Sequence, residues 1–211
     1  MRLSPELLVR AYASGVFPMD VDGQIEWFSP DPRAIIPLDG FNISQNLARL
    51  CRRGCFQMRV NTAFLSVMRC CADRQEGTWI SDEIIEGYCG LHRLGLAHSV
   101  EAWRDDELAG GLYGVALGGA FFGESMFHRV RDASKVALAT LVERLRARRY
   151  VLLDIQFMTE HLRRAGAVEI SRRTYLRRLA AALALARRFE GGGEEHQSDA
   201  PSAEKEDPRP G

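Results

Sequence analysis

Apolar residues recur along the chain with the spacing of a helix in some segments and with the alternation of a strand in others. Ser4 is followed by Pro5 and an acid, which is typical of a helix start, and the helical pattern then runs to Gly15. Residues 15–44 are rich in Pro, Gly and Asp, which predicts short strands and turns. Further along, the pattern predicts helices over residues 42–52, 62–72 and 81–95 and a short strand over residues 56–60.

Strand-like patterns dominate the middle of the chain. Ser99 and Glu101 alternate with Val100 and Ala102, as in a half-buried strand. Turn residues at 105–106 and 118–119 predict three antiparallel strands, over residues 98–104, 108–117 and 120–127. The remaining pattern predicts a buried strand over residues 150–157, a short strand over 168–170, and helices over 133–148, 158–164 and 174–188, the first with Asp132 as its N-cap.

This order of elements predicts a mixed α/β sheet of the kind that N-acetyltransferases use. In that architecture the sheet opens like a V at a strand–helix junction, and the acyl donor lies there. We expect a small N-terminal domain over residues 1–60 and an acetyltransferase-like domain over residues 61–189. Residues 190–211 have no apolar periodicity, which predicts a disordered acidic tail.

Three acids occupy positions where a strand pattern asks for apolar residues. Glu124 lies in the middle of a predicted strand, and Asp154 lies inside a nearly continuous apolar run. Because Gln156 is two residues after Asp154, both side chains project from one face, and Glu124 reaches them if the two strands are neighbours. The simpler interpretation is that each acid pairs with an arginine, but for Asp154 with Gln156 we favour a site. For Glu101 we favour simple pairing with an arginine.

Charge is distributed unevenly, although the chain has 28 basic and 28 acidic residues. Residues 190–211 carry seven acids and two bases, whereas residues 144–188 carry twelve arginines, no lysine and three acids. An arginine-rich region is either a solvated helix face or a surface for an anionic partner such as a nucleic acid. Aromatic residues near loops, among them Trp27 and Trp79, are either core or platforms for stacked bases.

Several classes of protein are disfavoured. The five cysteines fit neither a disulfide framework nor a zinc site, so we expect free thiols and no metal. No apolar run approaches the roughly 20 residues of a membrane span, and the N-terminus lacks the apolar core of a signal peptide, so we expect a cytoplasmic protein. The helix start near Asp132 lacks the glycine loop with which acetyl-CoA enzymes of this architecture bind pyrophosphate, which disfavours that donor.

Five sequence blocks, in order, are specific enough to identify a family: WFSPDPRAIIPL (27–38), GTWISDEIIEGYCGLHRLGLAHSVEAW (77–103), LAGGLYGVALGGAFFGESMFHRVRDASKVAL (108–138), LLDIQF (152–157) and GAVEISRRTYL (166–176). Together they resemble the leucyl/phenylalanyl-tRNA–protein transferases. The resemblance implies an aminoacyltransferase that moves leucine or phenylalanine, and less readily methionine, from its tRNA to proteins whose N-terminal residue is Arg or Lys. The product is a degradation signal of the N-end rule pathway. The resemblance implies no cofactor, and nothing in the sequence demands more than a monomer.

The resemblance also assigns site residues. The catalytic positions are Asp154, Gln156 and Glu124. Aromatic positions that hold the 3′-terminal adenosine are Trp27 and Trp79, and positions near the aminoacyl pocket are Tyr88, Leu112 and Phe121. Asp154 either takes the proton of the attacking amine through Gln156 or attracts the basic side chain of the acceptor. Two alternatives remain: an acyl-CoA-dependent N-acetyltransferase, and a non-catalytic RNA-binding module in which Asp154 has no role.

Overall fold

The computed structural model describes residues 3–190. The helices are α1 (Pro5–Ala13), α2 (Gln45–Arg52), α3 (Phe64–Ala72), α4 (Asp82–Arg93), α5 (Ala133–Ala147), α6 (Glu160–Arg164) and α7 (Arg172–Leu183). The strands are β1 (Phe17–Val21), β2 (Gln24–Phe28), β3 (Arg33–Ile36), β4 (Gln57–Val60), β5 (Ala97–Arg104), β6 (Glu107–Leu117), β7 (Ala120–His128), β8 (Leu152–Gln156) and β9 (Val168–Ile170).

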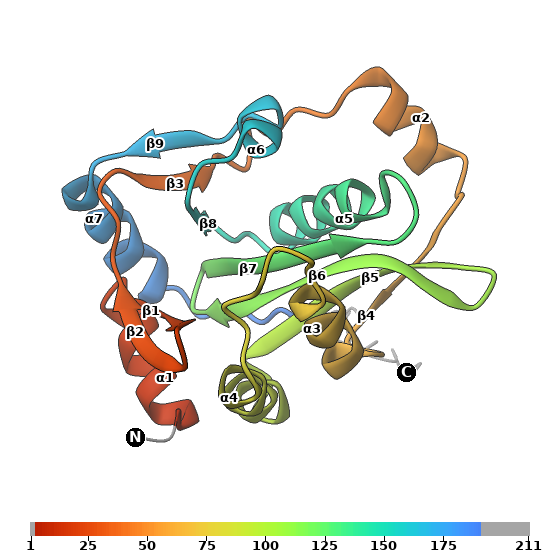
Figure 1. Cartoon of the computed structure of the whole chain (residues 1–211). Helices are drawn as coiled ribbons and strands as arrows, with labels where there is room; N and C mark the ends of the chain where they lie inside the picture. Colours follow the sequence, from red (N-terminus) through yellow and green to blue (C-terminus); the bar gives the residue numbers. More distant parts are fainter. Residues whose placement is uncertain (1–2, 191–211) are drawn as a thin grey trace, which may run out of the picture.

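Seven strands form one mixed sheet in the order β4-β5-β6-β7-β8-β3-β9, and β1 and β2 form a separate hairpin. The central β7–β8 pair is parallel, and the other neighbours in the sheet are antiparallel. Figure 1 shows α3 and α4 on one side of the strands β5–β7 and α5 on the other. The predicted mixed α/β class is confirmed, as are the three antiparallel strands in the middle of the chain.

Helix α5 covers one face of the sheet with the apolar stripe that the sequence predicts. Val136, Ala139, Val142 and Leu145 are all between 0 and 4% exposed. Burial of a Val or Leu side chain stabilises a fold by about 1.5–3 kcal/mol, so this stripe holds the helix on the sheet. Asp132 precedes the helix, but it has a φ of +67° and binds the Nζ of Lys135 at 2.6 Å; its side chain does not cap the helix.

The last helix is shorter than the sequence pattern predicts, since α7 ends at Leu183 and the predicted continuation to Arg188 is wrong. After it the chain inserts Phe189, which is 2% exposed, between aromatic rings. The ring of Phe189 stacks on Phe121 at 5.1 Å, and the guanidinium of Arg144 donates two hydrogen bonds to the Phe189 carbonyl. These contacts between distant segments outweigh the local preference for helix.

The predicted small domain shares the large sheet. Strand β3 lies between β8 and β9, and β4 pairs with β5, so two strands before residue 61 are hydrogen-bonded to strands that follow it. The division at residue 60 stays a prediction. The predicted acidic tail lies outside the described residues, apart from Glu190. All five cysteines are free, and no helix between residues 3 and 190 is long and apolar enough to cross a membrane.

Candidate active site

A β-bulge in β7 sets the direction of the Glu124 side chain. In the pairing of β6 with β7, Gly123 and Ser125 each have a partner and Glu124 between them has none. A Cβ on Gly114, the partner of Gly123, would lie 2.2 Å from the carbonyl oxygen of Phe122, so only glycine allows this approach of the strands. The bulge therefore explains how an acid occupies the middle of an apolar strand: it interrupts the alternation of side chains at that residue.

The carboxyl group of Glu124 accepts three hydrogen bonds. The hydroxyl of Tyr12 donates to Oε1 at 2.7 Å, that of Tyr88 to Oε2 at 3.2 Å, and the side-chain amide of Gln156 to Oε1 at 3.1 Å. The two tyrosine hydroxyls also contact each other; because each has only one proton to donate, a hydrogen bond between them replaces one of their bonds to Glu124. Burial raises the pKa of Glu124 to about 7, and the negative charge of Asp154 acts in the same direction, against the tyrosine hydrogen bonds.

Asp154 is fully buried and its two oxygens accept four hydrogen bonds. Arg33 donates from Nε to Oδ1 at 2.9 Å and from Nη2 to Oδ2 at 2.6 Å, and the Tyr175 hydroxyl donates to Oδ2 at 2.7 Å. The backbone N–H of Gln156 donates to Oδ1 at 3.0 Å. The guanidinium of Arg33 lies 4.8 Å from the ring centre of Phe17 and 4.5 Å from that of Tyr175. Asp154 thus has the arginine partner of the simpler interpretation and also contacts Gln156.

The sheet opens next to this pair of acids. The parallel pairing of β7 with β8 ends at Phe122 and Asp154, so Glu124 and Gln156 lie just beyond the last paired residues. A second bulge, at Ile155, interrupts the pairing of β8 with β3, and Gln156 has a φ of +57°. A left-handed conformation is costly for a residue other than glycine and is frequent at functional sites. The side-chain amide of Gln156 bridges the gap to Glu124, as the sequence predicts for neighbouring strands.

An apolar cavity of about 90 Å³ begins at Glu124 and extends under α5. Its walls are mostly aliphatic side chains from β6, β7, α5, β8 and α6, among them Leu112, Met126, Leu138 and Leu153. A largely aliphatic cavity of this kind accepts a hydrophobic side chain, and its polar lining comes from Tyr113, Glu124 and Ser125.

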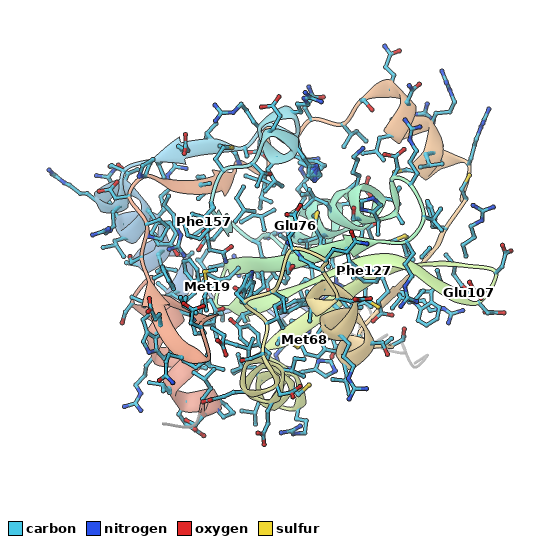
Figure 2. All side chains as sticks on the ribbon, in the orientation of Figure 1. Met19, Met68, Glu76, Glu107, Phe127 and Phe157 are labelled. Carbon is cyan, nitrogen blue, oxygen red and sulfur yellow. The ribbon has the colours of Figure 1, made fainter. Side chains whose placement is uncertain are left out.

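A wider cleft of about 340 Å³ adjoins this cavity, and Glu124, Ser125, Met126, Ile155 and Leu162 line both. The cleft adds aromatic side chains, Phe17, Trp79 and Phe157, together with the polar or charged Arg74, Gln156 and His161. Figure 2 labels Met19 and Phe157, which line the cleft from β1 and from the end of β8.

The structure brings together most of the predicted site residues. Glu124, Gln156 and Trp79 line the cleft, Leu112 lines the apolar cavity, and Tyr88 and Asp154 lie behind them. Two predicted residues lie elsewhere. Trp27 is half-buried on β2, where it pairs with Pro18 of β1, and it lines neither cavity. Phe121 is fully buried against Phe189 and lines neither cavity.

Sequence reasoning missed four residues that complete the site: Tyr12, Arg33, Arg74 and Tyr175. Arg33 is one of the largest fully buried side chains, and the only local signal is its place at the start of the apolar run Ala34–Ile36. Tyr12 and Tyr175 stand on helices with ordinary helical spacing, so nothing local distinguishes them from core residues.

Glu101 differs from the expectation of an arginine partner. Its carboxylate accepts hydrogen bonds from the Thr62 hydroxyl, the Ala63 backbone N–H at 2.9 Å, the Ser99 hydroxyl at 2.7 Å and the Trp103 indole at 3.1 Å. Together these four neutral donors lower the pKa of Glu101, although burial alone would raise it. The hydrogen bonds around Glu101 hold the start of α3 against β5, and Glu101 does not line the cleft.

Two family models match the chain. One, described as Leucyl/phenylalanyl-tRNA protein transferase, matches residues 35–180, and the other, described as the N-terminal domain of that transferase, matches residues 1–31. The chain is 58% identical over 189 residues to the leucyl/phenylalanyl-tRNA–protein transferase of Herpetosiphon aurantiacus, a match that covers 89% of this chain and 98% of the relative. It is 58% identical over 191 residues to that of Rubrobacter xylanophilus, covering 90% and 100%.

Among solved structures, a GCN5-related N-acetyltransferase-like protein from Streptococcus suis is similar with a TM-score of 0.39 and 14% identity. The match covers 79% of this chain and 64% of that one. The likeness is too distant to bear on the site.

Proposed function

The chain belongs to the leucyl/phenylalanyl-tRNA–protein transferase family, and we propose that the cleft at Glu124 is where it transfers an amino acid from tRNA to the N-terminus of a protein. One observation carries this proposal: an apolar cavity and an open, aromatic-lined cleft meet at a single carboxyl group. The cavity suits the side chain of the transferred residue, the cleft suits the two substrates, and the carboxyl group lies at their junction.

The donor would enter with its aminoacyl side chain in the apolar cavity. Leucine and phenylalanine are apolar and not branched at Cβ, so they reach into a narrow aliphatic pocket that Val or Ile fills poorly. Methionine is also unbranched and apolar, so the same pocket accepts it, and we expect methionyl-tRNA to be a poorer donor than the other two. Trp79, on the wall of the cleft, is placed to stack on the terminal adenine, since base stacking on an aromatic ring needs no sequence readout. We assign no such contact to Trp27.

The reaction is aminolysis of an activated ester. The N-terminal amine attacks the ester carbonyl carbon, a tetrahedral intermediate forms, and the 3′ oxygen of the terminal ribose leaves with a proton as the amide forms. An α-amino group has a pKa of about 7.7–8.0, so positioning and a weak base are sufficient. Glu124 fits the role of that base, because its pKa of about 7 lies near that of the amine and it faces the cleft.

Asp154 and Gln156 complete the proposed catalytic group. The Gln156 side chain lines the cleft and holds Glu124, so we assign it to orient the amine and the base. Asp154 lines neither cavity and its oxygens are occupied, and we assign it as a positioning residue that holds the Gln156 backbone N–H. We further propose that the acceptor begins with Arg or Lys, since an acid in the cleft attracts a cation, that the product of the transfer is an N-end rule degradation signal, and that the protein acts as a monomer.

A transfer assay tests the proposal. The protein is incubated with radiolabelled Leu-tRNA and an acceptor that begins with Arg, and label in the acceptor is counted. We expect transfer by the wild type and a fall in kcat of roughly 100-fold or more for Glu124→Gln. Glu107→Gln is the matched control, because Glu107 is exposed on the β5–β6 hairpin, far along the sheet in Figure 2.

Three outcomes of this assay distinguish the proposed function from its alternatives. Absence of transfer with intact tRNA and acceptor overturns the function. Binding of tRNA without transfer supports an RNA-binding module instead. Full activity of Glu124→Gln leaves the function standing but removes Glu124 as the base.

A further inference from the structure

Arg74 has a place in the cleft that the proposed chemistry does not use. Among the described residues that line the cleft, it is the only one with a permanent positive charge. We propose that Arg74 binds the phosphate on the 5′ side of the terminal adenosine of the donor tRNA. This inference rests on the proposed function, and it names a contact that selects a tRNA donor over a phosphate-free ester.

The guanidinium of Arg74 is held in place by two hydrogen bonds. Its Nε donates to the Cys71 carbonyl at 3.1 Å, and its Nη2 donates to the Ser125 hydroxyl at 2.8 Å. Ser125 follows Glu124 on β7, so the positive charge lies beside the proposed base. A guanidinium has five N–H donors, and the exposed side chain of Arg74 keeps donors for a ligand.

The loop that carries Arg74 also carries Trp79. This loop joins α3 to α4, and Figure 2 marks it with Glu76, which lies above the strands of the sheet. The carbonyl of Trp79 accepts a hydrogen bond from the Asp20 backbone N–H at 3.1 Å, which ties the loop to β1. The proposed adenine platform and the cation are thus presented by one anchored segment.

The covalent structure of the donor explains why a phosphate would lie there. The ester and the last phosphodiester are attached to the same ribose. If the ester lies at Glu124 and the adenine lies on Trp79, that ribose is held between them, and its phosphate emerges next to the loop. Arginine is well suited to phosphate because its planar donors match two phosphate oxygens. The alternative role for Arg74 is to polarise the ester carbonyl.

Two donors distinguish these roles. One is Phe-tRNA, and the other is 3′-O-phenylalanyl adenosine, which has the ester, ribose and adenine but no phosphate. For Arg74→Ala we expect the KM for Phe-tRNA to rise roughly 10- to 100-fold, because this is the change in affinity that the loss of one charge-assisted hydrogen bond causes. We expect kcat/KM for phenylalanyl adenosine to stay at the wild-type value. Arg74→Lys keeps the charge without the planar fork and should give an intermediate KM for Phe-tRNA.

Salt dependence and a matched control complete the experiment. The plot of log KM for Phe-tRNA against log salt should become shallower by about 0.7 in Arg74→Ala, as for loss of one phosphate contact to a single strand. Arg104→Ala, at the exposed end of β5, should leave both donors unaffected.

Each remaining result overturns the inference or the function beneath it. An equal loss with both donors means that Arg74 acts at the ester or supports the loop. Unchanged kinetics with both donors means that it contacts no phosphate. Inactivity of the wild type with both donors overturns the proposed function itself.

Discussion

The buried ion pair between Arg33 and Asp154 allows a strong test of how this site is held together. Arg33 is 1% exposed and Asp154 is 0% exposed. Burial opposes the charge of Arg33, but the hydrogen bonds and charge of Asp154 outweigh it and raise the pKa of the guanidinium. Arg33→Met keeps an unbranched side chain of similar length and removes the charge. The carboxylate of Asp154 is then left in the core with no cation.

The expected effect is large. Removal of one partner from a buried ion pair typically lowers the free energy of unfolding by about 3–5 kcal/mol. Here the variant loses the two bonds to Asp154 at 2.9 and 2.6 Å, and it also leaves the Gly15 carbonyl without its donor at 3.2 Å. In a protein of this size, such a loss lowers the melting temperature by roughly 6–20 °C.

Urea denaturation followed by circular dichroism measures the loss directly. The double variant Arg33→Met/Asp154→Leu removes the unpaired charge and should recover at least half of the loss. A loss below about 1 kcal/mol, of the size seen for exposed pairs, would refute this reasoning.

Further predictions concern the carboxyl group, the cavity and the bulge. The contribution of Glu124 to the free energy of unfolding should fall as pH rises from 4.5 to about 7, because Glu124 loses its proton near 4.5 in the unfolded chain but only near 7 when folded. The stability of the wild type relative to Glu124→Gln, measured by urea denaturation, should therefore fall over this range, and a difference that does not change with pH would contradict the assignment. Leu138→Phe fills part of the apolar cavity, so kcat/KM should fall about tenfold more for Phe-tRNA than for Leu-tRNA; equal losses would argue against this pocket. Gly114→Ala places a Cβ 2.2 Å from the Phe122 carbonyl oxygen and should cost about 1–3 kcal/mol, which an unchanged melting temperature would disprove.

The proposed roles of the two acids follow from their surroundings. The resemblance to the family favours Asp154 for the chemical step, because the family's catalytic acid falls on this position. In the folded protein its oxygens are occupied by Arg33, Tyr175 and the backbone of Gln156, so it is a poor partner for a mobile substrate. Glu124 faces the cleft, and its raised pKa suits proton transfer. In this proposal Asp154 holds the site together and Glu124 acts on the substrate.

The sequence by itself determined the local elements and the family. Apolar spacing predicted the helices and strands, because backbone geometry imposes a period of 3.6 or 2 on any segment with one buried face. Ser4 and Ser44 cap the starts of α1 and α2 with hydrogen bonds to nearby backbone N–H groups, which are local interactions and readable from sequence. The trio of Glu124, Asp154 and Gln156 was also visible, since acids and amides inside apolar runs require an explanation.

Only the tertiary structure decided how these residues are used. The bulge at Glu124 depends on the register between β6 and β7, and the arginine partner of Asp154 comes from 121 residues away in sequence. Phe189 ends the last helix early because distant aromatic rings bind it more favourably than a continued helix would. Such contacts depend on which segments the fold brings together, and a local pattern of polar and apolar residues does not contain that information.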